Sequence, residues 1–155
     1  MTLPSHADSI YIERSPADLY AMVSDVTRMG EWSPVTKAGR WDDGATAEVG
    51  AWFFGRNETP DATWETRCQI VAADPGREFA FVTLGTVARW GYSFEATGAG
   101  TTVTESWEFL PGGIDFFRER FGDDADRQID ERLERARTGI PQTLAELKAV
   151  AESTG

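Results

Sequence analysis

One carboxylate stands out among the residues that could do chemistry, because the pattern around it predicts that it is buried. Residues 102–109 alternate between polar and apolar side chains, so Glu105 shares one strand face with Val103, Trp107 and Phe109. Apolar surroundings raise the pKa of a carboxyl group and suit it to act as a general acid or base. Alternatively, Glu105 accepts hydrogen bonds from Trp or Tyr donors and only braces the fold.

The same alternation in residues 51–95 assigns further side chains to the face of Glu105. Most are aromatic, and the polar ones that could orient a carbonyl or hydroxyl group are Asn57, Thr66 and Tyr92. An apolar pocket with a few convergent polar groups is typical of small-molecule sites. The residues expected to bind such a ligand are Trp32, Phe53, Asn57, Trp64, Thr66, Phe81, Trp90, Tyr92, Trp107, Phe117, Phe121, Ile140 and Leu144.

Other reactive side chains lack partners in the sequence pattern. Cys68 is predicted to face inwards as a small core residue, because no histidine can be placed beside it. The only histidine, His6, lies in an N-terminal segment that is expected to be loose. A single cysteine excludes an internal disulfide and a zinc site built from several thiolates. We therefore expect no metal and no cofactor.

Two aromatic residues are expected on the outer face of the sheet. Arg56 and Glu58 should face water, and the alternation then places Trp52 and Phe54 on the same side. A partner subunit or the N-terminal segment could cover these rings, although single exposed aromatics are ordinary. The protein is accordingly expected to be a monomer or a homodimer.

The elements that must position these residues follow from capping and turn signals. A strand is expected over residues 7–13. Residues 15–18, Ser-Pro-Ala-Asp, start a short helix through Val23, and a second helical turn covers 25–29. Turn sequences such as Asp-Pro-Gly at 74–76 leave only short connections between the later strands, which indicates antiparallel hairpins.

A long helix is predicted for the last thirty residues. Apolar residues recur at spacings of three and four across 129–151, while Arg132 and Arg135 lie on the opposite, charged face. Pro141 removes one backbone hydrogen bond, so we expect a kink near Gly139 and a helix in two segments that lies across the sheet.

Three phenylalanines precede that helix. Phe116, Phe117 and Phe121 come just after Pro-Gly-Gly at 111–113, which is expected to be flexible. The rings could form a lid at the mouth of a pocket, or could simply pack a short helix against the sheet.

Composition narrows the class of partner. The 155 residues suit a single domain, 1–155, and the formal net charge of −11 disfavours nucleic acid and anionic membrane surfaces. There is no run of roughly 20 apolar residues, as a membrane-spanning helix needs, and the N-terminus has no signal-peptide pattern. A cytoplasmic location is the default expectation.

The order of these elements resembles the helix-grip fold of the START-like (SRPBCC) superfamily and, within it, the polyketide cyclase/dehydrase family. The resemblance covers nearly the whole chain and rests on Ser15–Tyr20, Asp25-Val26, Trp32–Pro34, Val49–Ala51, Gly55–Asn57, Trp64, Asp74–Arg77, Trp90, Gly100–Glu105 and the closing helix. It implies an α+β fold: a curved antiparallel sheet of about seven strands wrapped on a long C-terminal helix, with two short helices after the first strand. It further implies a deep cavity for lipids, polyketides, sterols or other hydrophobic molecules, without specifying a reaction.

Three functions remain open from the sequence. The first is binding of an apolar, ring-containing or lipid-like molecule in an internal cavity, with aromatic walls that stack on planar rings. The second is a cofactor-independent cyclase or dehydratase in which Glu105 moves a proton. The third is a protein-interaction module that uses Trp52, Phe54 or the acidic cluster at 123–126. An interaction module should have a filled core, whereas a carrier or an enzyme should have a cavity.

Overall fold

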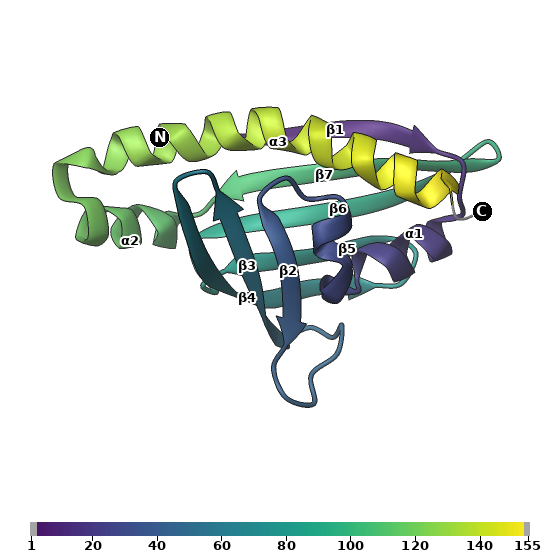
Figure 1. Ribbon diagram of the computed structural model, residues 1–155, viewed down its shortest axis with the longest axis horizontal. Coiled ribbons are helices and arrows are strands. Elements are labelled where there is room, and N and C mark those ends of the chain that lie inside the picture. The colour runs from purple at the N-terminus through teal and green to yellow at the C-terminus, as the bar shows by residue number, and fades with distance from the viewer. Residues whose placement is uncertain (1–2, 154–155) are drawn as a thin grey trace.

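The computed structural model describes residues 3–153. A seven-stranded antiparallel sheet lies beside one long helix, and shorter helices close its two ends (Figure 1). In chain order the elements are β1 (Ser5–Ile12), α1 (Pro16–Val23), η1 (Val26–Glu31), β2 (Thr36–Trp41), β3 (Trp52–Thr59), β4 (Ala62–Asp74), β5 (Glu78–Thr83), β6 (Ala88–Thr97), β7 (Gly100–Phe109), α2 (Pro111–Phe121), η2 (Gly122–Asp124) and α3 (Ala125–Ser153).

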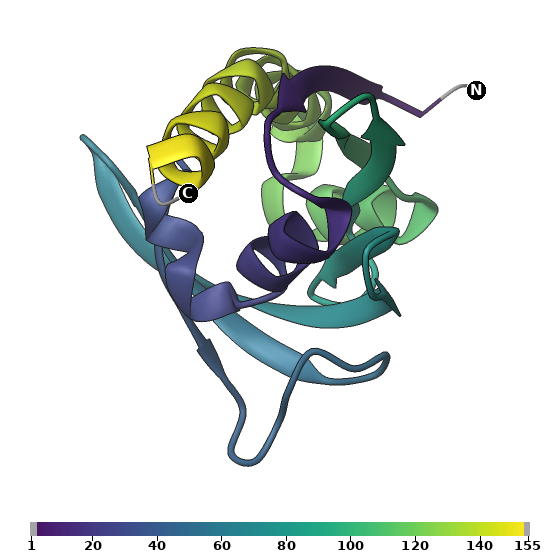
Figure 2. The ribbon, with the colours of Figure 1, turned by 90° about the vertical axis from the view of Figure 1, so that its right-hand side faces the viewer.

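The sheet has the strand order β1-β7-β6-β5-β4-β3-β2. Each strand from β2 to β6 pairs with the next one in the chain, so β2 forms one edge of the sheet. The first strand, β1, pairs with β7 and forms the opposite edge. Seen nearly along α3, the sheet curls from β1, beside the helix, round to β2 and β3 (Figure 2). Register shifts at 70–72 and 36–38 mark irregularities that help a strand to bend. This architecture confirms the predicted α+β helix-grip fold.

The period-two pattern of the strands is visible in their burial. Along β7, Val103, Glu105, Trp107 and Phe109 are buried, and the side chains between them are more exposed. The outer face of β3 carries Trp52 and Phe54, as predicted, and both rings are half-buried.

Arginines, rather than the N-terminal segment, cover those outer rings. The guanidinium carbon of Arg67 lies 4.3 Å from the Trp52 ring centroid, and that of Arg40 lies 4.3 Å from the Phe54 ring centroid. The N-terminal strand β1 lies at the opposite edge of the sheet, so the alternative in which the N-terminal segment covers these rings was wrong for the described residues, and the alternative of a partner subunit is not tested.

The chain enters the sheet earlier than expected. β1 begins at Ser5, and His6 lies opposite Trp107 of β7. The His6 Nε2 atom is 2.6 Å from Asp8 Oδ2. The expectation of a loose segment at His6 was therefore wrong, because backbone pairing with β7 holds the residue in the sheet.

Capping explains the two short helices after β1. Ser15 Oγ accepts a hydrogen bond from the Asp18 backbone N–H at 3.1 Å, with Pro16 in the first turn of α1. Asp25 Oδ1 accepts from the Thr27 N–H at 3.1 Å at the start of η1. Both helices occur where the capping pattern predicts them.

The segment 111–113 is the first turn of α2 and not a flexible connection. A Cβ atom at Gly113 would lie 2.6 Å from the Val87 carbonyl oxygen and 2.7 Å from Phe109 Cζ. Glycine therefore serves close packing at this position, and it lets α2 sit against the end of the sheet.

Helix α3 is continuous across Pro141, so the expected division into two segments was wrong. One missing backbone hydrogen bond is outweighed by packing on both sides of the proline, where Ile140, Leu144 and Leu147 are buried. No helix within residues 3–153 is both long and apolar enough to cross a bilayer.

Candidate functional site

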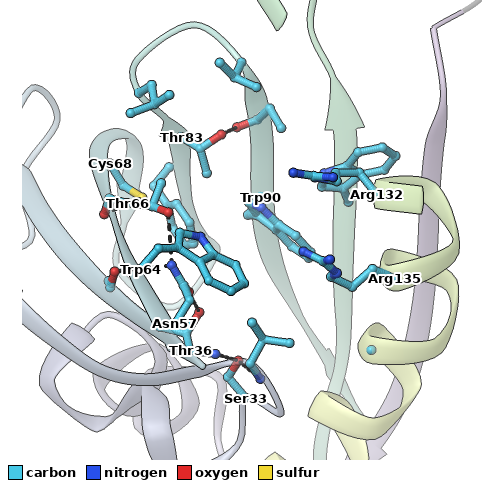
Figure 3. A pocket seen from close by; sticks show the side chains of 18 of the residues that line it. Ser33, Thr36, Asn57, Trp64, Thr66, Cys68, Thr83, Trp90, Arg132 and Arg135 are labelled. Atoms are coloured by element: carbon cyan, nitrogen blue, oxygen red, sulfur yellow. Dashed lines mark hydrogen bonds between the residues drawn. The ribbon is translucent and has the colours of Figure 1, made fainter. Parts of the chain in front are cut away.

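A cavity of about 850 Å³ lies between the inner face of the sheet, α2 and the N-terminal half of α3 (Figure 3). Strands β3 to β7 form its walls, and the loop at 32–35 forms its floor beside Asn57. A volume of this size is within the range of small-molecule sites.

Aromatic rings make up much of the cavity wall. Phe53 and Phe81 meet edge to face with centroids 5.1 Å apart, and Trp90 lies 6.4 Å from Trp107. Trp64 and Trp90 are only partly buried, because part of each indole faces the cavity. The rings thus pack against their neighbours at their edges and still border an open space.

Most residues expected at the ligand site do line this cavity: Trp32, Phe53, Asn57, Trp64, Thr66, Phe81, Trp90, Tyr92, Glu105, Trp107, Phe117 and Phe121. Ile140 and Leu144 are not among the lining residues. They are 1% and 2% exposed in the hydrophobic core, because α3 turns its apolar stripe towards the core rather than towards the cavity.

A neighbouring stripe of α3 faces the cavity instead. Apart from the adjacent pair Glu131 and Arg132, its members follow one another at spacings of three or four residues: Gln128, Glu131, Arg132, Arg135, Gly139 and Thr143. The sequence pattern assigned Arg132 and Arg135 to the solvent-facing side of the helix, and so missed them. The spacing of three residues between Arg132 and Arg135 indicated that both lie on one face of the helix. Charged residues at such a spacing usually face solvent, so this pattern did not point to a cavity.

Glu105 is 3% exposed, and its Oε1 atom has no hydrogen-bond partner among the described residues. Burial raises the pKa of the Glu105 carboxyl to about 8, and a hydrogen bond with Tyr92 opposes part of that rise. Burial, with Glu105 nearby, also raises the pKa of Tyr92 well above its ordinary value. At neutral pH the site therefore holds a mostly protonated carboxylic acid with an unpaired oxygen.

A row of polar side chains crosses the sheet near the loop at 32–35. The Thr36 hydroxyl donates to Asn57 Oδ1 at 2.8 Å, and Asn57 Nδ2 donates to Thr66 Oγ1 at 3.0 Å (Figure 3). Both the oxygen and the nitrogen of the Asn57 side-chain amide are thus hydrogen-bonded. Among the described residues the Thr66 hydroxyl has no acceptor for its own proton, so it can donate to a ligand.

Cys68 lines the cavity but is not suited to nucleophilic chemistry. Burial raises the pKa of its thiol to about 12, which keeps the sulfur protonated and unreactive at neutral pH.

Helix α2 and two arginines border the mouth of the cavity. Phe117 is buried against Phe109 and Phe121, with ring centroids 5.2 and 5.1 Å away. The Arg132 guanidinium carbon lies 5.1 Å from the Phe117 ring centroid, and that of Arg135 lies 5.9 Å from the Trp64 ring centroid. Arg135 and Trp64 thus approach each other from α3 and β4.

The chain is similar to several solved structures. The Polyketide_cyc-like protein Cgl2372 from Corynebacterium glutamicum is 44% identical, with 97% of this chain and 92% of that chain covered and a TM-score of 0.71. The di-domain ARO/CYC StfQ from the steffimycin biosynthetic pathway is 14% identical, with 99% of this chain and 52% of that chain covered and a TM-score of 0.73. Protein NE0264 from Nitrosomonas europaea is 12% identical, with 97% and 96% covered and a TM-score of 0.71.

The two distant structures share the fold alone. No match was found among curated proteins. The sequence profile described as "Polyketide cyclase / dehydrase and lipid transport" matches residues 5–152. The chain therefore belongs to the polyketide cyclase/dehydrase and lipid transport family.

Proposed function

We propose that this protein binds a hydrophobic, ring-containing or lipid-like small molecule in the cavity between the sheet and α3. The observation that carries the proposal is the cavity of about 850 Å³, bordered by aromatic rings, at whose wall Glu105 Oε1 is buried without a partner. Buried polar atoms are normally hydrogen-bonded, so an unpaired one beside a cavity favours a ligand that supplies the missing partner.

Each part of the wall has a role in this proposal. Trp64 and Trp90 stack on the rings or chain of the ligand. The protonated Glu105 donates a hydrogen bond to a carbonyl or hydroxyl oxygen, and Thr66 donates a second. Ile140 and Leu144 support the wall from behind without contacting the ligand.

Native mass spectrometry of freshly purified protein tests this function. We expect a co-purified apolar compound of less than about 600 Da, a mass that suits a cavity of this size. Bare protein that also binds nothing from a panel of flavonoids, polyketides and fatty acids would overturn the proposal.

A second candidate function is a cofactor-independent cyclase or dehydratase. It is favoured by the raised pKa of Glu105, which places this group near the range in which a carboxyl exchanges protons at neutral pH. Glu105→Gln keeps the shape of the side chain and replaces the O–H donor of the acid with the N–H donors of an amide, but it cannot transfer a proton. It should leave ligand affinity within about tenfold and abolish turnover; unchanged turnover would remove Glu105 as the acid or base.

The third function considered from the sequence, a protein-interaction module, required a filled core. The cavity of about 850 Å³ argues against a protein-interaction module with a filled core. Trp52 and Phe54, its suggested contact points, are already half-covered by Arg67 and Arg40.

A further inference from the structure

Three arginines line the cavity together, in a chain whose formal net charge is −11. Arg132 and Arg135 project from α3 at a spacing of three residues, and Arg120 projects from α2. Figure 3 shows Arg132 and Arg135 extending from α3 towards the side of the cavity where Trp90 and Trp64 lie. Three guanidinium groups thus share one cavity of an acidic protein.

Two of these arginines lack the acidic partners that most other arginines of residues 3–153 have. Arg28 pairs with Glu31 at 2.7 Å, and Arg137 pairs with Glu134 at 2.6 Å. Within residues 3–153, by contrast, Arg120 and Arg135 make no ion pair.

Acidic residues also line the cavity, and those near the arginines or on the facing strands are Asp61, Glu65 and Glu131. Glu131 lies 3.8 Å from Arg132 but 2.5 Å from Arg127, which binds it more closely. On the far rim, Glu65 is paired with Arg40 at 2.5 Å, and Asp61 lies in the turn between β3 and β4. Within residues 3–153, Glu131 is therefore the only acid in an ion pair with any of the three arginines, and it lies closer to Arg127 than to Arg132.

Arg132 is held in this position at an electrostatic cost. Burial lowers the pKa of its guanidinium, and the neighbouring charges of Arg135 and Arg120 lower it further, while Glu131 opposes part of this shift. Its hydrogen bond goes to the neutral Gln128 Oε1 at 2.6 Å, and its face lies over Phe117 and Phe121. A partly desolvated cation among other cations is stabilised when an anion binds beside it.

We propose that the ligand is an amphipathic anion whose oxyanion head group binds Arg120, Arg132 and Arg135 at the mouth while its apolar body fills the cavity. The proposal rests on the cavity-binding function above and specifies its ligand class. Guanidinium groups match the paired oxygens of carboxylates and phosphates. The ligand then meets three zones in order: a cationic mouth, walls of aromatic rings at Trp64 and Trp90, and the acid Glu105.

A matched pair of fluorescent probes tests the head group separately from the cavity. 8-Anilinonaphthalene-1-sulfonate and N-phenyl-1-naphthylamine have the same rings, and only the first carries an anionic sulfonate. We expect the sulfonate to bind about tenfold more tightly, a ratio that corresponds to one favourable charge interaction. Raising the salt concentration from 50 to 500 mM should weaken binding of the sulfonate and leave the neutral probe unchanged.

Charge-removing variants locate the effect. Arg135→Gln and Arg120→Gln should each weaken sulfonate binding by about fivefold and change binding of the neutral probe by less than about twofold. Arg132→Gln should do the same, and Arg132→Lys should retain most of the sulfonate affinity. Arg137→Gln removes the same charge from an exposed position of α3 and should change neither affinity. Thermal unfolding of each variant verifies that it folds. If Arg132→Gln does not fold, Arg135→Gln is the variant that decides the test.

Equal affinity for the two probes, or equal effects of Arg135→Gln and Arg137→Gln, would overturn the anionic head group and leave cavity binding intact. If neither probe binds, the cavity function fails and the head-group inference fails with it. In the supporting case, displacement by decanoate or by decyl phosphate then distinguishes a carboxylate head group from a phosphate.

Discussion

Tyr92 on β6 and Glu105 on β7 are directly opposite each other in the sheet, and both side chains line the cavity. Their proximity gives the cavity wall a hydroxyl and a carboxylic acid side by side in apolar surroundings. Burial and the nearby Glu105 raise the pKa of Tyr92, whereas the hydrogen bond with Tyr92 favours the ionised form of Glu105 and opposes part of the rise that burial causes.

The first prediction concerns stability and pH. The pKa of Glu105 is raised from 4.5 to about 8 in the folded protein, so the native state holds this proton more tightly than the unfolded state. The resulting stabilisation is complete below pH 4.5, diminishes as the pH rises, and is lost above pH 8. The unfolding temperature of the wild type should fall across this range, while Glu105→Gln shows a flatter profile. Parallel profiles would contradict a raised pKa at this position.

The second prediction tests whether the open space is needed for binding. Ala88 is buried on the inner face of β6 and lines the cavity, so Ala88→Phe places a ring inside it. We expect ligand affinity to fall by at least about tenfold, while the protein stays folded with a stability change of less than about 3 kcal/mol. Ser93→Phe adds the same ring to the exposed outer face of the same strand and serves as the control. Isothermal titration with the co-purified compound measures the difference, and equal affinities would place the ligand elsewhere.

The third prediction concerns the polar row at Asn57. Asn57→Ala removes the partner of both Thr36 and Thr66 from a buried position. The free energy of unfolding should fall by about 1–3 kcal/mol, because two hydroxyl groups lose their hydrogen bonds. Thr104→Ala, which breaks the exposed Ser9–Thr104 hydrogen bond of 2.7 Å, should change it by less than about 0.5 kcal/mol. Urea unfolding compares the two, and equal effects would contradict a structural role for the row.

The fourth prediction compares two glycines in helices. Gly113→Ala would place a methyl group 2.6 Å from the Val87 carbonyl oxygen, and should destabilise the protein by about 1–3 kcal/mol as α2 moves away from the sheet. At Gly139 the nearest atom to an added Cβ is Pro34 Cγ at 3.9 Å. Gly139→Ala should therefore stabilise the helix by about 0.5–1 kcal/mol. Thermal unfolding measures both, and effects of the same sign would refute the packing argument.

Period-two alternation made the strand faces predictable from sequence. It placed Glu105 and Trp107 on the inner face and Trp52 and Phe54 on the outer face, as the structure has them. It also assigned Asn57 to the cavity side. Alternation is reliable here because successive side chains of a strand point to opposite faces of the sheet, so each side chain has only two possible orientations.

The rotation of α3 about its axis was not predictable in the same way. A helix presents several stripes at similar spacings, and the choice between the one with Ile140 and the one with Arg135 depends on where the sheet curves away. The role of Gly113 was not predictable either, because it also depends on tertiary contacts. The atoms that leave no room for a Cβ at this position belong to Val87 and Phe109, elsewhere in the chain.

The proposed binding function would also link the lifetime of this protein to the supply of its ligand. Side chains around an unfilled interior lack dispersion contacts that a solid core would provide, and a ligand at 100 times its dissociation constant adds about 2.7 kcal/mol to the free energy of unfolding. Since proteases act mainly on opened chains, the empty form should be degraded faster than the loaded form. Cells would then keep most of this protein when its ligand is abundant.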